Sequence, residues 1–181
     1  MFKPISYNNI TPDISGKALI APNAIISGDV TIGECSNIWY NVVIRGDVAP
    51  ITIGKDTNIQ DGSIIHVTRA NHIQNKTSKK SPTIIGSGVT IGHKAMLHAC
   101  FIEDYSFIGM SSTIMDMARV ETESMVAAGA IITPGKTIKR GEVWAGNPGK
   151  FLRKMSEEEI KFIKQSAENY TLLAKEYFSP S

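Results

Sequence analysis

The sequence predicts a parallel β-helix of triangular cross-section, followed by one α-helix. Three observations lead to this fold class. An aliphatic residue returns at every sixth position over most of the chain, a small residue fills the fifth place of most of these units, and the rhythm ends near Lys154, where helical spacing begins. A period of six fits neither a helix nor a simple alternating strand, so each unit must hold a short strand and a bend.

The aliphatic positions fall into three runs. They are Ile14, Ile20, Ile26, Ile32, Ile38 and Ile44, then, after three extra residues around Pro50, Ile53, Ile59 and Ile65, and finally Ile85, Ile91, Leu97, Ile102, Ile108, Ile114, Val120, Val126, Ile132 and Ile138. The interruption over residues 66–84 predicts a loop, and the step from Leu97 to Ile102 is one residue short. If three units make one coil, these side chains point inward and stack in layers.

Small residues recur within the units, where the chain must turn. The fifth places hold Ala18, Ala24, Ser36, Ser63, Ala95, Ser106, Ser112, Ala118, Ser124 and Ala130. Glycine often follows the aliphatic residue, as at Gly33, Gly54, Gly86, Gly92 and Gly109. We expect these small residues to let the backbone turn tightly near each corner.

The C-terminal segment has a different pattern. After turn residues at Gly146, Pro148 and Gly149, Ser156 and Glu159 have the spacing of a capping box. Apolar residues then follow at steps of three and four, which predicts an amphipathic helix. The predicted organisation is therefore a β-helix over residues 1–154 and a helix within 155–181 that packs on the β-helix or on a neighbouring subunit and carries no chemistry.

Composition limits the classes of function. The 181 residues carry a formal charge of +2, with 42% hydrophobic and 20% charged residues, which is typical of a single globular domain. This small charge gives no reason to expect nucleic acid or an anionic membrane as a partner. The N-terminus lacks the apolar core of a signal peptide, and no apolar run approaches the roughly 20 residues of a membrane span. We therefore expect a cytoplasmic protein.

Two of the four histidines, His93 and His98, lie five positions apart. His93 is third in the unit that starts at Ile91, and His98 is second in the unit that starts at Leu97, so the two side chains leave adjacent faces of the prism. A metal–nitrogen bond spans only about 2 Å, so one chain would chelate an ion poorly with this pair.

A neighbouring subunit would change this geometry. If identical prisms pack around a threefold axis, His93 of one chain can meet His98 of the next, and His66, which is second in its unit like His98, can complete the site. Three neutral imidazoles and an open position are the composition of a catalytic zinc site. Any single exposed histidine is more often a polar surface residue.

Two further motifs accompany the histidines. They are "IRGD", with Arg45 and Asp47, and "IQDGSIIHV", with Gln60 and Asp61 one unit before His66. With "IGHKAMLHAC", these motifs resemble the γ-class carbonic anhydrase family, and the resemblance extends from about Ile14 to Lys154. It implies a left-handed hexapeptide-repeat β-helix, since handedness does not follow from the repeat itself.

The resemblance also implies roles for these residues. His66, His93 and His98 correspond to the metal ligands of a homotrimer with its sites at the subunit interfaces. Gln60 corresponds to a residue that hydrogen-bonds the metal-bound water, and Arg45, Asp47 and Asp61 to an ion-pair network beside it. The implied reaction is hydration of carbon dioxide to bicarbonate by zinc hydroxide, although imidazoles also suit iron(II) and cobalt.

The sequence departs from the best-known members of this family in one respect. Those members carry glutamates for proton transfer where this chain has Val48 and Arg69, and the loop here is basic. We therefore expect weak or conditional hydratase activity, with His72 as a conceivable relay. Three alternatives stay open: an acyltransferase that uses acyl-coenzyme A, a zinc-hydroxide hydrolase or thioesterase, and an inactive assembly subunit.

Overall fold

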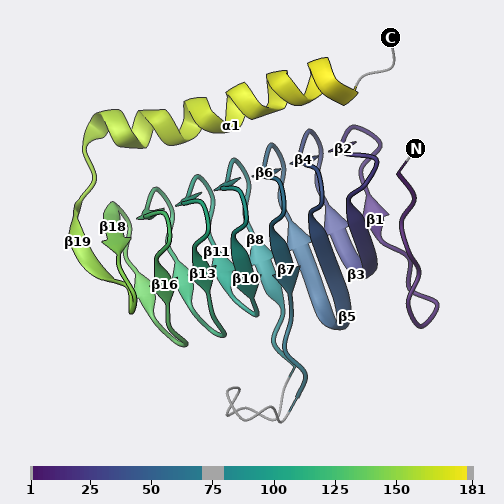
Figure 1. Ribbon diagram of the computed structural model, residues 1–181, viewed down its shortest axis with the longest axis horizontal. Coiled ribbons are helices and arrows are strands. Elements are labelled where there is room, and N and C mark those ends of the chain that lie inside the picture. The colour runs from purple at the N-terminus through teal and green to yellow at the C-terminus, as the bar shows by residue number, and fades with distance from the viewer. Residues whose placement is uncertain (1, 71–79, 179–181) are drawn as a thin grey trace.

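The computed structural model describes residues 2–70 and 80–178 and shows a parallel β-helix with α1 lying along it (Figure 1). Successive short strands wind around the prism, and strands of neighbouring coils pair in parallel; the final pair, β18 with β19, is antiparallel. The predicted class, a mainly β solenoid with one C-terminal helix, is confirmed. No helix among the described residues is long and apolar enough to cross a membrane.

The strands form three faces. The first face contains the opening halves of β3 (Ile25–Ile32) and β5 (Val43–Ile53), then β7 (Ile64–His66), β10 (Met96–His98), β13 (Thr113–Ile114) and β16 (Ile131–Ile132). The second face contains β1 (Asp13–Ile14), the closing halves of β3 and β5, β8 (Thr83–Ile85), β11 (Phe101–Ile102), β14 (Arg119–Val120) and β17 (Thr137–Ile138). The third face contains β2 (Leu19–Ile20), β4 (Asn37–Ile38), β6 (Asn58–Ile59), β9 (Thr90–Ile91), β12 (Phe107–Ile108), β15 (Met125–Val126), β18 (Glu142–Ala145) and β19 (Lys150–Lys154).

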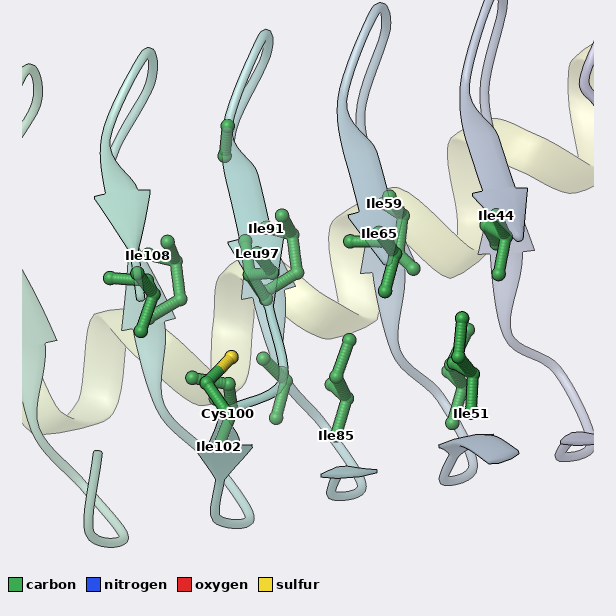
Figure 2. Close-up of a cluster of buried hydrophobic side chains, with 14 of the residues drawn as sticks. Ile44, Ile51, Ile59, Ile65, Ile85, Ile91, Leu97, Cys100, Ile102 and Ile108 are labelled. Atoms are coloured by element: carbon green, nitrogen blue, oxygen red, sulfur yellow. The ribbon is translucent and has the colours of Figure 1, made fainter. Parts of the chain in front are cut away.

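The aliphatic repeat fills the core of the prism. From Ile26 to Ile138 every residue of the repeat is buried, whereas Ile14 and Ile20, in the first coil, are only partly buried. Strand register stacks equivalent positions directly, for example Ile59 on Ile91 and Ile91 on Ile108, as Figure 2 shows. Burying each such side chain contributes roughly 1.5–3 kcal/mol, so the repeat itself supplies the driving force for the fold.

Each corner combines a left-handed residue with the small residue that follows it. The left-handed backbone conformation occurs at the fourth place of the units, as at Cys35 (φ 58°), Lys94 (φ 58°) and Gly62 (φ 71°). The small residue at the fifth place is instead buried beneath the corner. Some of the serines at this place donate to the next coil, as from Ser36 Oγ to the Gly54 carbonyl oxygen at 2.6 Å, whereas Ser112 Oγ donates to the Gly109 carbonyl oxygen of its own coil at 2.7 Å.

Helix α1 (Glu157–Phe178) begins with the expected capping box. The Ser156 N–H donates to Glu159 Oε2 at 2.9 Å, and the Glu159 N–H donates to Ser156 Oγ at 3.2 Å. The helix packs across β2, β4, β6 and β9 of the third face. Trp39 anchors its C-terminal half through edge-on contacts with Tyr170 and Tyr177, each at 5.6 Å between ring centroids.

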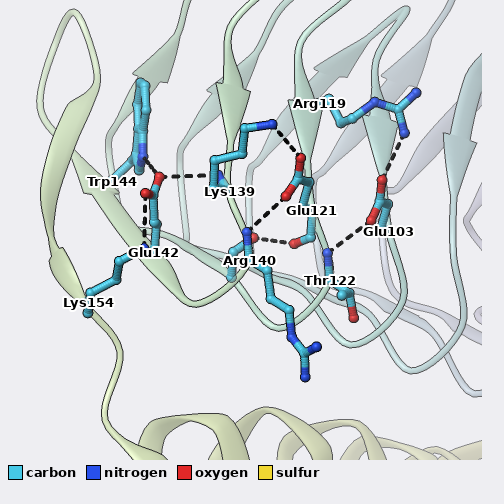
Figure 3. Close-up of polar contacts among 10 residues, drawn as sticks. Glu103, Arg119, Glu121, Thr122, Lys139, Arg140, Glu142, Trp144 and Lys154 are labelled. Atoms are coloured by element: carbon cyan, nitrogen blue, oxygen red, sulfur yellow. Dashed lines mark hydrogen bonds and ion pairs between the residues drawn. The ribbon is translucent and has the colours of Figure 1, made fainter.

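A row of ion pairs joins the later coils (Figure 3). Arg119 donates to Glu103 at 2.8 Å, Lys139 to Glu121 at 2.8 Å, and Lys154 to Glu142 at 3.2 Å. These surface pairs are screened by water and are each worth at most about 1 kcal/mol. Their common effect is to hold successive corners in register on the side of the prism remote from the histidines.

Candidate metal centre

His66 and His98 lie side by side on the first face. They end β7 and β10, and these strands pair so that His98 lies directly opposite His66. The two ring centroids are 5.2 Å apart, and the side chains are 19% and 26% exposed. Both rings line one cavity of about 240 Å³. The repeat therefore brings together two residues that are 32 positions apart in the chain.

A buried carboxylate holds the ring of His98. Asp116 is 2% exposed, and its Oδ2 lies 2.9 Å from His98 Nδ1, while Thr68 donates a short hydrogen bond to the other oxygen. An ionised carboxylate can only accept, so Nδ1 of His98 carries the proton. The lone pair is then on Nε2, which is the arrangement found in carboxylate–histidine–metal groups.

Asp47 has the same relationship to His66. Its Oδ1 lies 3.0 Å from His66 Nε2, and Arg45 pairs with its other oxygen. Burial alone would raise the pKa of Asp47, but the hydrogen bond from His66 and the charge of Arg45 outweigh it and leave that pKa below its usual value. Burial lowers the pKa of His66, aided by Arg45 and partly offset by Asp47. His66 is therefore neutral at pH 7, as a metal ligand must be.

His93 lies apart from this pair. It follows β9 at the corner between the third and first faces, is 41% exposed, and places Nδ1 2.9 Å from Oδ2 of Asp61. It lines a different cavity, of about 300 Å³, together with Gln60. Asp61 thus pairs with a histidine of its own chain. The first face separates the corner that holds His93 from the opposite corner that holds His66 and His98.

A single chain therefore presents two partial sites. Among residues 2–70 and 80–178, no group of three His, Cys, Asp or Glu side chains is placed to hold one metal ion. Each of the three histidines nevertheless donates one ring N–H to a carboxylate, which leaves one nitrogen lone pair on each ring. This donor set fits zinc chemically, but the site with His66 and His98 lacks one imidazole and the site with His93 lacks two.

Gln60 is held firmly beside His93. Its side chain is 4% exposed, and Nε2 donates to Oδ1 of Asn58 at 3.0 Å. Because the amide nitrogen is turned toward Asn58, Oε1 is the acceptor that the side chain has left. This is the end of the amide that could accept a hydrogen bond from a water or hydroxide.

The two positions where the family resemblance would place a glutamate also line the site. Val48 and Arg69 both border the cavity that contains His66 and His98. The only carboxylate among the residues that line this described cavity is Asp47, which is already paired with Arg45 and His66. His72 lies outside the residues that the structure describes.

Sequence reasoning missed several polar residues of the site. Asp116 and Thr68 hold His98, and Asn58 holds Gln60. The coil after His98 is one residue short, because Leu97 pairs with Ile114, so Asp116 lies one place beyond the position that register sets beside His98. A search for carboxylates within one residue of a full coil from each histidine would have found Asp116 in the sequence.

Comparison with known proteins gives the family. No protein-family model matches the chain. It is 51% identical over 164 residues to "Gamma carbonic anhydrase 1, mitochondrial" of Arabidopsis thaliana, covering 91% of this chain but 58% of that protein. It is 44% identical over 162 residues to the "Probable carbonic anhydrase" of Methanocaldococcus jannaschii, covering 90% of this chain and 96% of that protein. The chain thus spans less than two thirds of the plant relative and nearly all of the archaeal one.

A solved structure matches the fold. The crystal structure of a hexapeptide transferase family protein from Anaplasma phagocytophilum superposes with a TM-score of 0.89 at 46% identity, covering 97% of this chain and 98% of that one. The chain belongs to the γ-carbonic anhydrase family and has its left-handed hexapeptide β-helix fold.

Proposed function

We propose that the protein is a metal-dependent carbonic anhydrase that hydrates carbon dioxide to bicarbonate as a homotrimer, with each site shared between two subunits. One observation carries the proposal. His66 and His98 lie at one edge of the first face and His93 at the other, each with one ring nitrogen held by a carboxylate. Rotation about a threefold axis would bring opposite edges of neighbouring prisms together.

The surface of the first face supports this assembly. Its outward positions form a ladder of mostly apolar residues, in which Ile25 is 47% and Ile64 is 43% exposed, with Val43, Met96 and Ile131 half-buried. A row of aliphatic side chains on an exposed sheet marks an interaction surface. A second copy is the occupant we infer, because another copy of this chain supplies the one imidazole missing beside His66 and His98 and the two missing beside His93.

The residues of the proposed site would have different roles. His66, His93 and His98 would hold the metal, and zinc, iron(II) and cobalt all suit such ligands. A bound zinc ion supplies a water of lowered pKa, about 7 in the known carbonic anhydrases. Gln60 would orient that water through Oε1. Asp47, Asp61 and Asp116 would fix the ligand rings, and Arg45 would keep Asp47 ionised.

We further propose that turnover is limited by proton transfer. Hydration releases a proton that must reach solvent, and Asp47 is already committed to two partners. Val48 cannot carry a proton, and Arg69 stays protonated at all relevant pH values. Hydratase activity should therefore be slow unless an external buffer accepts the proton. A cytoplasmic location is proposed on composition alone.

The acyltransferase alternative explains less of the site. A single histidine suffices as general base in such an enzyme. An acyltransferase mechanism gives no reason for three histidines that are each paired with a carboxylate. The names of the relatives also support the carbonic anhydrase proposal. The Anaplasma protein is described as a transferase family protein, but its similarity to this chain supports the acyltransferase alternative only as a shared fold.

Complementation between variants tests the shared site. His93→Ala and His98→Ala each remove a different half of every site, so each homotrimer should lose its metal and its hydration of carbon dioxide. When the two chains are unfolded, mixed and refolded, about one quarter of the sites should regain all three ligands if they mix at random. Metal per chain and stopped-flow hydration should both recover to that fraction. No recovery in mixed trimers of confirmed mass would overturn the shared site.

A further inference from the structure

A buried chain of hydrogen bonds runs from Gln60 to α1. Gln60 Nε2 donates to Asn58 Oδ1 at 3.0 Å, Asn58 Nδ2 donates to Thr90 Oγ1 at 2.8 Å, and Thr90 Oγ1 lies 3.2 Å from Ser166 Oγ. Asn58 and Thr90 are fully buried, Gln60 is 4% exposed, and Ser166 is 7% exposed. Asn58 and Thr90 are paired neighbours on β6 and β9, beneath the helix.

The chain of hydrogen bonds has a fixed polarity. Asn58 accepts from Gln60 with its oxygen, so its nitrogen must find an acceptor on the other side, and Thr90 provides it. The Thr90 hydroxyl accepts from Asn58, and a further hydrogen bond joins it to Ser166 Oγ, in which either oxygen can be the donor. Val89 also offers a carbonyl oxygen to Asn58 Nδ2, but at 3.4 Å and therefore weakly.

Loss of the Thr90 hydroxyl would remove this polarity. The Asn58 side chain could then turn its amide over without a change of shape. Its nitrogen would face Gln60 Nε2, and two donors cannot bond to each other. Gln60 would have to present Oε1 to Asn58 instead, which would turn its nitrogen toward the cavity beside His93. The acceptor would be lost from the site although no residue of the site had been changed.

We propose that Thr90 and Ser166 are positioning residues, and that α1 controls through them which end of the Gln60 amide faces the site. The inference rests on the proposed function for its catalytic consequence. Helix α1 also borders the same cavity through Phe162, Ser166 and Tyr170, beside Gln60 and His93. On this proposal the helix would take part in the site, whereas the sequence predicted that it carries no chemistry.

The first test follows the Gln60 amide directly. Hydrogen exchange of the Gln60 side-chain NH₂ is measured by ¹⁵N NMR in the metal-free trimer, with the signal assigned by its loss in Gln60→Glu. In Thr90→Val and in Ser166→Ala we expect exchange about tenfold faster, the change expected for loss of one buried hydrogen bond. Thr90→Ser, which keeps the hydroxyl, should restore slow exchange. Ser166→Ala keeps the test valid if Thr90→Val does not fold.

A matched control separates positioning from simple loss of packing. Ile163 is fully buried on α1 and has an apolar side chain that cannot join the chain of hydrogen bonds. Ile163→Val should lower the melting temperature and leave the Gln60 signal unchanged. In the zinc-loaded trimer, Thr90→Val should lower kcat by about tenfold at unchanged metal content, with Thr90→Ser near the wild-type value.

The outcomes distinguish the two proposals. If the wild-type trimer does not hydrate carbon dioxide, the proposed function fails, while the exchange measurement still tests the chain of hydrogen bonds. Equal Gln60 exchange in Thr90→Val and Thr90→Ser would overturn the positioning role. An effect of Ile163→Val as large as that of Thr90→Val would also overturn it, because any loosening of the helix would then suffice.

Discussion

Oδ2 of Asp116 lies 2.9 Å from Nδ1 of His98, and the aspartate is almost completely buried. Burying a carboxylate is costly unless it is hydrogen-bonded, and here both oxygens have partners, His98 and Thr68. The pair fixes the plane and the tautomer of the imidazole. In the proposed metal site, a ligand fixed in this way would lose little freedom on coordination.

Asp116→Ala should weaken metal binding. Without the carboxylate, the His98 ring can rotate and the proton can move to the nitrogen that would face the metal. The dissociation constant for zinc should rise by about 10–100-fold, measured in the trimer by competition with a chromophoric chelator. Asp56→Asn, at an exposed corner remote from the histidines, is the control. An unchanged affinity in Asp116→Ala would show that the pair has only a structural role.

A charge on the first face should prevent assembly. Ile64 on the first face and Ile84 on the second are 43% and 41% exposed, so they are matched in chemistry and accessibility. Ile64→Arg would place an unpaired charge in the proposed interface, which costs several kcal/mol when buried. We expect a monomer that binds no stoichiometric metal, as measured by light scattering and metal analysis. Ile84→Arg should stay trimeric, and a trimeric Ile64→Arg would contradict the proposed interface.

The repeat made most of the fold predictable. A single periodic pattern predicted the strands, the side chains that point into the core and the stacking of successive coils. This was possible because every coil packs in the same way. The corner conformation was not predictable, since the fourth place holds residues as different as Cys35, Lys94 and Tyr105. There the buried fifth place and the stacked strands impose a positive φ that the local sequence does not favour.

The site was predictable only in part. Histidines are rare in the chain, and their places in the repeat directed attention to them. The partners of the site gave no such signal, because Thr68, Asn58, Thr90 and Ser166 are common polar residues that become notable only when three-dimensional register brings them together. Asp116 is an exception, since it lies within one residue of a full coil from His98.

Glutamates beside the cavity should speed turnover. Val48 and Arg69 both line the cavity with His66 and His98, so carboxylates there could accept the proton released by hydration. The double variant Val48→Glu, Arg69→Glu should raise kcat by roughly tenfold or more in dilute buffer, within the usual range for general acid–base catalysis. Stopped-flow assays at increasing imidazole concentration measure the effect.

The buffer response provides the control for this prediction. Wild-type turnover should rise steeply with imidazole concentration, and turnover of the double variant only slightly, because the buffer replaces a group that the variant already has. Lys80→Glu, on the exposed loop, changes the charge without entering the cavity. If Lys80→Glu accelerates turnover as much as the double variant does, the change in local electrostatics, and not proton transfer, explains the faster turnover.

Glycine at the stacked corners should be irreplaceable. A Cβ on Gly54 would lie 2.6 Å from the carbonyl carbon of Gly86, so Gly54→Ala must push two coils apart. Overpacking of this kind lowers the free energy of unfolding by about 1–3 kcal/mol. Gly16 has no atom within 4 Å of the same position, so Gly16→Ala should change stability by less than about 0.5 kcal/mol. Thermal unfolding at fixed protein and metal concentration compares the two variants, and equal melting temperatures would mean that the coils are not in close backbone contact at this column.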